Sequence, residues 1–105
     1  MAVLVDLIPA LLQKTKEGKI EWDSISTESF IARLGENSAE VGYSRQGTAK
    51  LSLLDSAGRM LETVNWTELS PPFDKQLDEL VEIARRKALR IDETVKDVKG
   101  FLDRL

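Results

Sequence analysis

The chain has 105 residues with 15 lysines and arginines, 18 aspartates and glutamates, and neither cysteine nor histidine. Its net charge of −3 gives it no overall electrostatic attraction to nucleic acid or to an anionic membrane. The lack of Cys and His excludes thiolate nucleophiles, Cys-His and Ser-His triads, disulfides, and zinc, haem or iron–sulfur sites built on those ligands. We therefore predict a protein that is not an enzyme and that holds no metal ion or other cofactor.

The length and composition predict one domain over residues 1–105. A hydrophobic content of 42% can supply a core without disulfide or metal cross-links. The apolar opening, residues 1–12, contains Asp6 and Pro9, lacks the basic start of a secretion signal, and is shorter than the roughly 20 apolar residues that span a bilayer. We expect a cytoplasmic protein that does not enter a membrane.

The first predicted element is an amphipathic helix over residues 1–17. Its apolar residues recur at three- and four-residue spacing, at Leu4, Leu7, Ile8, Leu11 and Leu12. Gly18 suits the left-handed position that follows a helix. Pro9 cannot donate a hydrogen bond to the carbonyl of Val5, so the helix either begins near Asp6 or is kinked there.

Residues 19–66 predict a five-stranded antiparallel β-meander. Short segments rich in β-branched and aromatic residues are separated by turn clusters about ten residues apart. These segments are residues 20–26, 29–34, 39–45, 48–55 and 59–66. Connections this short join only antiparallel neighbours.

Alternation along the strands places most of their apolar side chains on one face, which we expect to form the core. This set is Ile20, Trp22, Phe30, Ala32, Leu34, Val41, Tyr43, Leu51 and Leu53. The opposite face also carries apolar residues, at Ile25, Ile31 and Leu54. The last strand has apolar residues on both faces, with Met60, Val64 and Trp66 on one and Leu61 on the other. The sequence leaves open whether these residues are scattered or form a contiguous binding patch.

Residues 73–105 predict a helical C-terminal region with an apolar seam. Its spacing alternates between four and three residues, through Leu77, Val81, Ala84, Ala88, Ile91, Val95, Val98, Leu102 and Leu105. Such a heptad repeat over about four heptads is typical of a coiled coil. A straight helix along the seam would be roughly 43 Å long, which exceeds the size of a compact domain of this length.

Two arrangements accommodate this helix. In the first, the chain breaks near residues 90–92, with Asp92 as a new N-cap, and both shorter helices pack on the sheet. In the second, the helix is continuous and its last turns pair with a second copy or another protein. The apolar stripe narrows after Asp92, with Phe101 beside it, and this narrowing suits a partner helix. The candidate interaction residues are Val95, Val98, Leu102 and Leu105.

Two charged clusters suggest other functions. The carboxylates of Asp74, Asp78 and Glu82 share a helix face and could hold a cation, but acidic residues are common in the first turns of helices. We therefore predict no metal site there.

The basic cluster consists of Arg85, Arg86, Lys87 and Arg90. It could contact phosphates, although no aromatic residues are interleaved and four acidic residues lie nearby. A regulator that binds nucleic acid through this cluster is the alternative function, and we expect it less than a protein partner.

A motif at the first helix–strand junction resembles a group of small uncharacterised bacterial proteins. It runs through Leu11-Leu12, Thr15-Lys16-x-Gly18-Lys19-Ile20-x-Trp22 and Ser29-Phe30, and then through Asp55-x-x-Gly58-x-x-Leu61-Glu62. The resemblance covers most of residues 4–66. It implies a bacterial or phage source and a helix, β-meander and helical C-terminus, but no activity and no catalytic residues.

Together these patterns predict an α+β domain with an N-terminal helix, a five-stranded meander and a long or broken C-terminal helix, with the helices on one sheet face. The overlong seam favours a non-catalytic protein-interaction or regulatory module that self-associates through its C-terminal helix.

Overall fold

The structure, a computed structural model, describes residues 3–105, so the predicted helical start at residues 1 and 2 lies outside the described residues. The chain begins with the 3-10 helix η1 (Leu4–Asp6) and helix α1 (Leu7–Lys16). The strands are β1 (Asp23–Ser26), β2 (Ser29–Leu34), β3 (Asn37–Tyr43), β4 (Ala49–Leu54) and β5 (Met60–Asn65). The 3-10 helix η2 (Trp66–Glu68) leads to helices α2 (Phe73–Ala88) and α3 (Ile91–Asp103).

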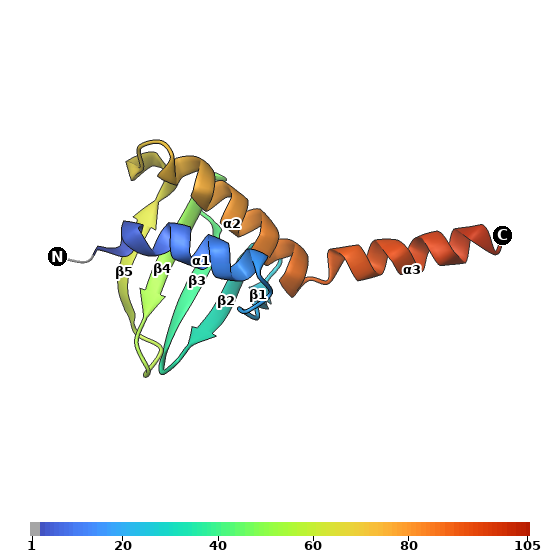
Figure 1. Cartoon of the computed structure of the whole chain (residues 1–105), viewed down its shortest axis with the longest axis horizontal. Helices are drawn as coiled ribbons and strands as arrows, with labels where there is room; N and C mark the ends of the chain where they lie inside the picture. The colour runs from blue at the N-terminus through green and yellow to red at the C-terminus, as the bar shows by residue number, and fades with distance from the viewer. Residues whose placement is uncertain (1–2) are drawn as a thin grey trace.

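The strands form one sheet in the order β1-β2-β3-β4-β5, and each is antiparallel to the next. Helices α1 and α2 lie side by side over one face of this sheet (Figure 1). The predicted α+β fold class and meander are therefore confirmed. The largest differences in strand bounds are at β1, which begins at Asp23 because Ile20 to Trp22 cross from the helix to the sheet, and at β3, which begins after a tight turn at Gly35 and Glu36.

The core fills the space between the two helices and the sheet. One row of register partners, Phe30, Val41, Leu51 and Val64, crosses the four strands β2 to β5 and is buried throughout. Helix α2 meets this face with the buried residues Leu77, Leu80, Val81 and Ala84, and helix α1 with Ile8, Leu11 and Leu12. Most of the predicted core residues are buried, and the others (Ile20, Leu34, Tyr43 and Leu53) pack half-buried at its margin.

The opposite sheet face carries apolar residues toward its edges, among them Leu54, which pairs in register with Met60. Ile25 and Met60 are exposed, but they lie on the two edge strands β1 and β5. A polar row separates them, because Glu40 pairs in register with Ser52, and the buried Ser52 hydroxyl shares a 2.9 Å hydrogen bond with that of Thr63. This face is therefore not the stronger candidate for a binding surface.

The junction between α1 and the sheet is closed by a Schellman turn. Gly18 has a φ of +75°, its N–H donates to the carbonyl of Thr15, and the N–H of Lys19 donates to that of Lys14. The chain then places Trp22 back over the helix, where its indole Nε1 donates to Thr15 Oγ1 at 3.1 Å. Both of these side chains are buried.

Pro9 does not disturb helix α1. It is the third residue of the helix, and the preceding turn is the 3-10 helix η1, so no regular helical hydrogen bond is lost at its nitrogen. Asp6 occupies the N-cap position, as one of the two alternatives predicted, although its side chain makes no capping hydrogen bond to α1.

The C-terminal seam is broken at Arg90. This residue has a left-handed backbone with a φ of +53°, which ends α2 and turns the chain into α3. The predicted N-cap is wrong by two positions: Arg90 is the N-cap, and Asp92 lies inside the first turn of α3.

Helix α3 extends away from the rest of the molecule (Figure 1), and it lengthens the structure to 58 × 30 × 27 Å. None of its residues is buried, and its main contacts are with α2. The structure thus combines parts of both arrangements. The helix is broken, as the first one predicted, while the apolar residues beyond the break are exposed, as the second one required.

We expect Gly42→Ala to lower the free energy of unfolding by about 1–3 kcal/mol. A Cβ at Gly42 would lie 2.3 Å from the carbonyl oxygen of Glu28, so the turn between β1 and β2 would have to shift. Urea unfolding followed by tryptophan fluorescence measures the effect. Gly100→Ala is the matched control, because no atom lies within 4 Å of a Cβ there, and equal unfolding midpoints for the two variants would contradict the prediction.

We expect Thr15→Val to cost about 1–3 kcal/mol, because it keeps the shape of the side chain but leaves the buried indole N–H of Trp22 without an acceptor. Urea unfolding followed by circular dichroism measures the loss. In a Trp22→Phe background the same substitution should cost much less, since no N–H remains to be left unpaired. An equal cost in both backgrounds would show that the hydrogen bond is not the cause.

Candidate functional site

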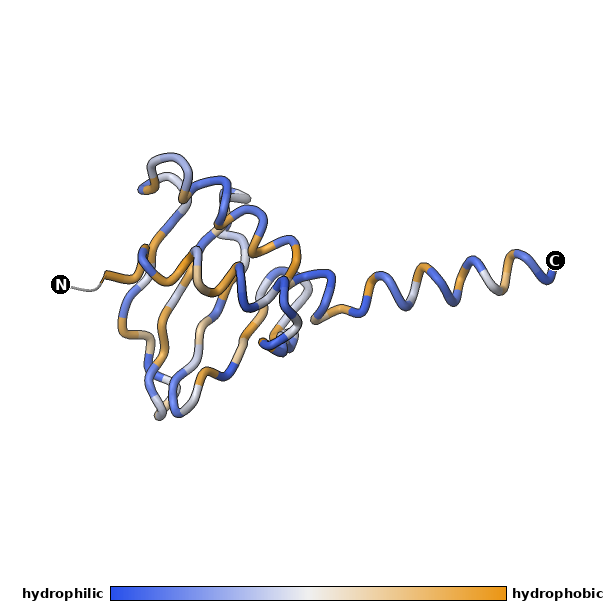
Figure 2. The backbone as a smooth tube through the Cα atoms, viewed as in Figure 1, coloured by the Kyte–Doolittle hydropathy of each residue, from blue (hydrophilic) through white to orange (hydrophobic). Residues whose placement is uncertain are grey.

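The clearest candidate site is the apolar face of α3. Val95, Val98, Phe101 and Leu102 each leave between 52% and 59% of their surface exposed, and Leu105 leaves 88%. In Figure 2 apolar and hydrophilic segments alternate along α3, and the ribbon of Figure 1 shows no other element beside it. We name this surface, formed by Val95, Val98, Phe101, Leu102 and Leu105, the α3 stripe.

The α3 stripe contains all four of the predicted interaction residues. Val95, Val98 and Leu102 lie on α3, and Leu105 follows two residues after the helix ends at Asp103. It adds Phe101, which the sequence pattern placed beside the seam. The structure also shows a shallow groove along this face, lined by Thr94, Val95, Val98, Lys99 and Leu102. The heptad spacing gave no reason to single out Thr94 and Lys99, because neither is a seam position.

The local sequence of α3 supports a helix only in part. Asp92 and Glu93 lie in the first turn, where the helix dipole favours acidic residues, and Thr94 Oγ1 donates to the carbonyl of Arg90 at 2.9 Å. Gly100, however, lies within the helix, where glycine costs about 1 kcal/mol relative to alanine. A helix of 13 residues is marginal in water by itself. Covering the α3 stripe would therefore stabilise the helix as well as bury its side chains.

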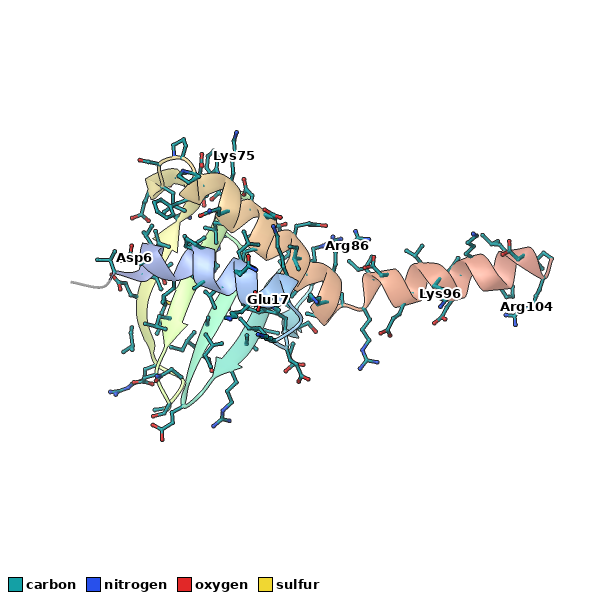
Figure 3. The ribbon with its side chains drawn as sticks, in the orientation of Figure 1. Asp6, Glu17, Lys75, Arg86, Lys96 and Arg104 are labelled. Carbon is teal, nitrogen blue, oxygen red and sulfur yellow. The ribbon has the colours of Figure 1, made fainter. Side chains whose placement is uncertain are left out.

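A charge pair bridges the break between α2 and α3. Arg86 lies near the end of α2 (Figure 3). Its guanidinium contacts the Asp92 carboxylate, and it also lies 3.8 Å from Glu82 Oε1. The hydrogen bond and charge of Asp92, helped by Glu82, raise the pKa of Arg86 above its usual value. Both side chains are exposed, so solvent screens this pair and it contributes little to stability; it orients α3 more than it anchors it.

Two residues of the basic cluster, Arg85 and Arg86, are paired with carboxylates. Arg85 donates to Glu82 at 3.3 Å, and Arg86 is paired as described. Lys87 and Arg90 border a hollow that Glu21 and Asp23 also line. The four basic residues therefore do not form an uninterrupted cationic surface.

Two of the three candidate cation-binding carboxylates, Asp74 and Glu82, also have partners within the chain. Asp74 accepts a hydrogen bond from the N–H of Lys75 at 2.8 Å, and Glu82 is paired with Arg85. Within residues 3–105 no group of three or more acidic side chains is arranged to hold a metal ion. Over the same residues, no helix combines the length and the apolar character that crossing a membrane requires.

No protein-family model matches the sequence, and no curated protein or solved structure is significantly similar to it. The resemblance to a group of small bacterial proteins therefore stays a prediction.

Because carboxylates accompany the basic cluster, we expect little binding to a short labelled DNA duplex, even at low salt. Fluorescence anisotropy of the duplex, titrated with protein, measures this. Binding that weakens steeply as salt is added, and that is lost in Lys87→Gln with Arg90→Gln, would instead favour the nucleic-acid alternative.

Proposed function

We propose that this chain is a non-catalytic protein-interaction module that binds another polypeptide through the α3 stripe. The observation that carries the proposal is the exposure of that stripe on a helix held away from the sheet. Soluble proteins seldom leave a contiguous row of large apolar side chains uncovered unless it is a contact surface. A row on one helix face fits a partner helix that supplies a complementary row.

The remaining titratable groups give the proposal indirect support. Within residues 3–105, the carboxyls with a resolved shift are Glu17 and Asp55, and both have a lowered pKa. For Glu17 the main cause is the hydrogen bond from Gln13, and for Asp55 it is the hydrogen bond from the N–H of Arg59. A general acid or base works best with a pKa near neutrality, so these shifts suit turn and helix-end structure better than catalysis.

The separation of α3 from the packed part of the molecule also supports the proposal. The sheet, α1 and α2 bury their apolar residues against one another, whereas α3 buries none. The core therefore does not require α3, and α3 is available to a partner. We expect such a module to act in the cytoplasm and to form a dimer or a complex with another protein.

We expect Val95→Asp with Val98→Asp to abolish association while the rest of the protein stays folded, because two carboxylates would have to be buried in the contact. Multi-angle light scattering across a concentration series, together with pull-down from a lysate of the source organism, measures the loss. Lys96→Asp with Gly100→Asp is the control, since it adds acidic residues off the α3 stripe.

The unfolding midpoint of the double-valine variant should stay close to that of the wild type, since α3 contributes nothing to the core. An unchanged mass and an unchanged pull-down in this variant would contradict the proposed function.

A further inference from the structure

We propose that the partner of α3 is α3 of a second copy of this chain, packed in the antiparallel direction. This inference rests on the proposed function and specifies its partner and geometry. It follows from the heptad positions of α3, in which Val95 and Leu102 take position a, and Ile91, Val98 and Leu105 take position d.

In an antiparallel pair of helices, each a residue meets a d residue of the partner. One register satisfies this rule over the whole helix: Ile91 lies opposite Leu102 of the second copy, and Val95 opposite Val98 of the second copy. The twofold axis repeats both layers, so four apolar layers form. Leu105 extends past the last layer toward the region where α2 of the second copy ends.

The charges beside the seam are complementary in this register. Asp92 and Lys99 occupy the e positions, which face each other across an antiparallel pair. Each Asp92 then lies beside Lys99 of the second copy, and the symmetry gives two such pairs. On the other side of the seam, Phe101 lies next to Thr94 of the second copy and adds apolar contact.

A parallel pair lacks this complementarity. There the g position of one helix faces the e position of the other, so Lys99 would face the uncharged Thr94. A parallel pair would also bring the two sheet domains together at the same end, because α3 leads directly away from the sheet (Figure 1). The antiparallel pair places the domains at opposite ends and opposes the two helix dipoles.

The length of α3 sets the strength of the contact. Its 13 residues span about 20 Å, which is short for a coiled coil. Stable interfaces generally bury about 1,200–2,000 Å², and smaller ones are transient. The dimer is therefore reversible, and its population rises with protein concentration.

Charge reversal tests the register. Sedimentation equilibrium of the full chain at low ionic strength gives the dimer dissociation constant. We expect Asp92→Lys and Lys99→Asp each to raise this constant about tenfold, since each replaces two attractive pairs by two repulsive ones. The double variant D92K/K99D should regain the wild-type constant, and so should an equal mixture of the two single variants. The double variant still lacks the Arg86–Asp92 pair within one chain. Recovery of the wild-type dissociation constant would therefore show that the intermolecular pair, and not the Arg86–Asp92 pair, caused the weakening in the single variants.

The absence of cysteine allows a direct test of direction. In the antiparallel register the two copies of position 102 lie roughly 16 Å apart, too far for a disulfide, whereas positions 102 and 91 face each other. Leu102→Cys mixed with Ile91→Cys under mild oxidation should therefore give the mixed disulfide, identified by mass spectrometry. Leu102→Cys alone should give little disulfide-linked dimer.

The outcomes separate this inference from the proposed function. The antiparallel geometry would be overturned if Leu102→Cys alone formed a disulfide-linked dimer and neither charge reversal changed the dissociation constant. If that dimer were nevertheless lost in Val95→Asp with Val98→Asp, the result would still support the α3 stripe as the contact. A chain that stays monomeric at every concentration would overturn the second copy as partner. In that case, pull-down of another protein that depends on the same two valines would leave the proposed function standing.

Discussion

The packing of α2 against the centre of the sheet is the contact on which the rest of the structure depends. Its apolar face covers β2, β3 and β4, where Phe30, Val41 and Leu51 form the buried middle of the sheet. Helix α1 fills the space beside it, and Trp22 closes the end of that space through its hydrogen bond to Thr15. With one sheet face covered in this way, the core is complete before α3 begins.

The end of α2 then determines the direction of the rest of the apolar seam. The left-handed conformation of Arg90 breaks the helix there, and the apolar stripe continues beyond the sheet on the separate helix α3. A non-glycine residue in this conformation costs about 1–2 kcal/mol, which the contacts on either side must offset. The Arg86–Asp92 pair bridges the turn, but it is too exposed to hold α3 by itself. Contact of α3 with a partner would supply the missing stabilisation.

Much of the fold could be read from local patterns, because those patterns reflect local physics. The alternation of Phe30 with Ala32 and of Leu51 with Leu53 identified the buried face, and the short turns required antiparallel neighbours. Gly18 identified the end of α1 for the same reason, since the left-handed position there favours glycine. The placement of Val64 on the same face as Met60 was wrong. A register shift between Leu53 and Leu54 sends Met60 to the opposite face, while Val64 pairs with Leu51 in the core.

The candidate site was predictable only as a set of residues. The sequence by itself determined the helical seam and its narrowing after Asp92, because heptad spacing depends only on the period of the helix. The tertiary structure decided that the seam breaks at Arg90, that α3 leaves the sheet, and that the groove beside Val95 and Val98 includes Lys99. These outcomes depend on how much of the seam the sheet can cover, and that limit is set by contacts between segments far apart in the chain.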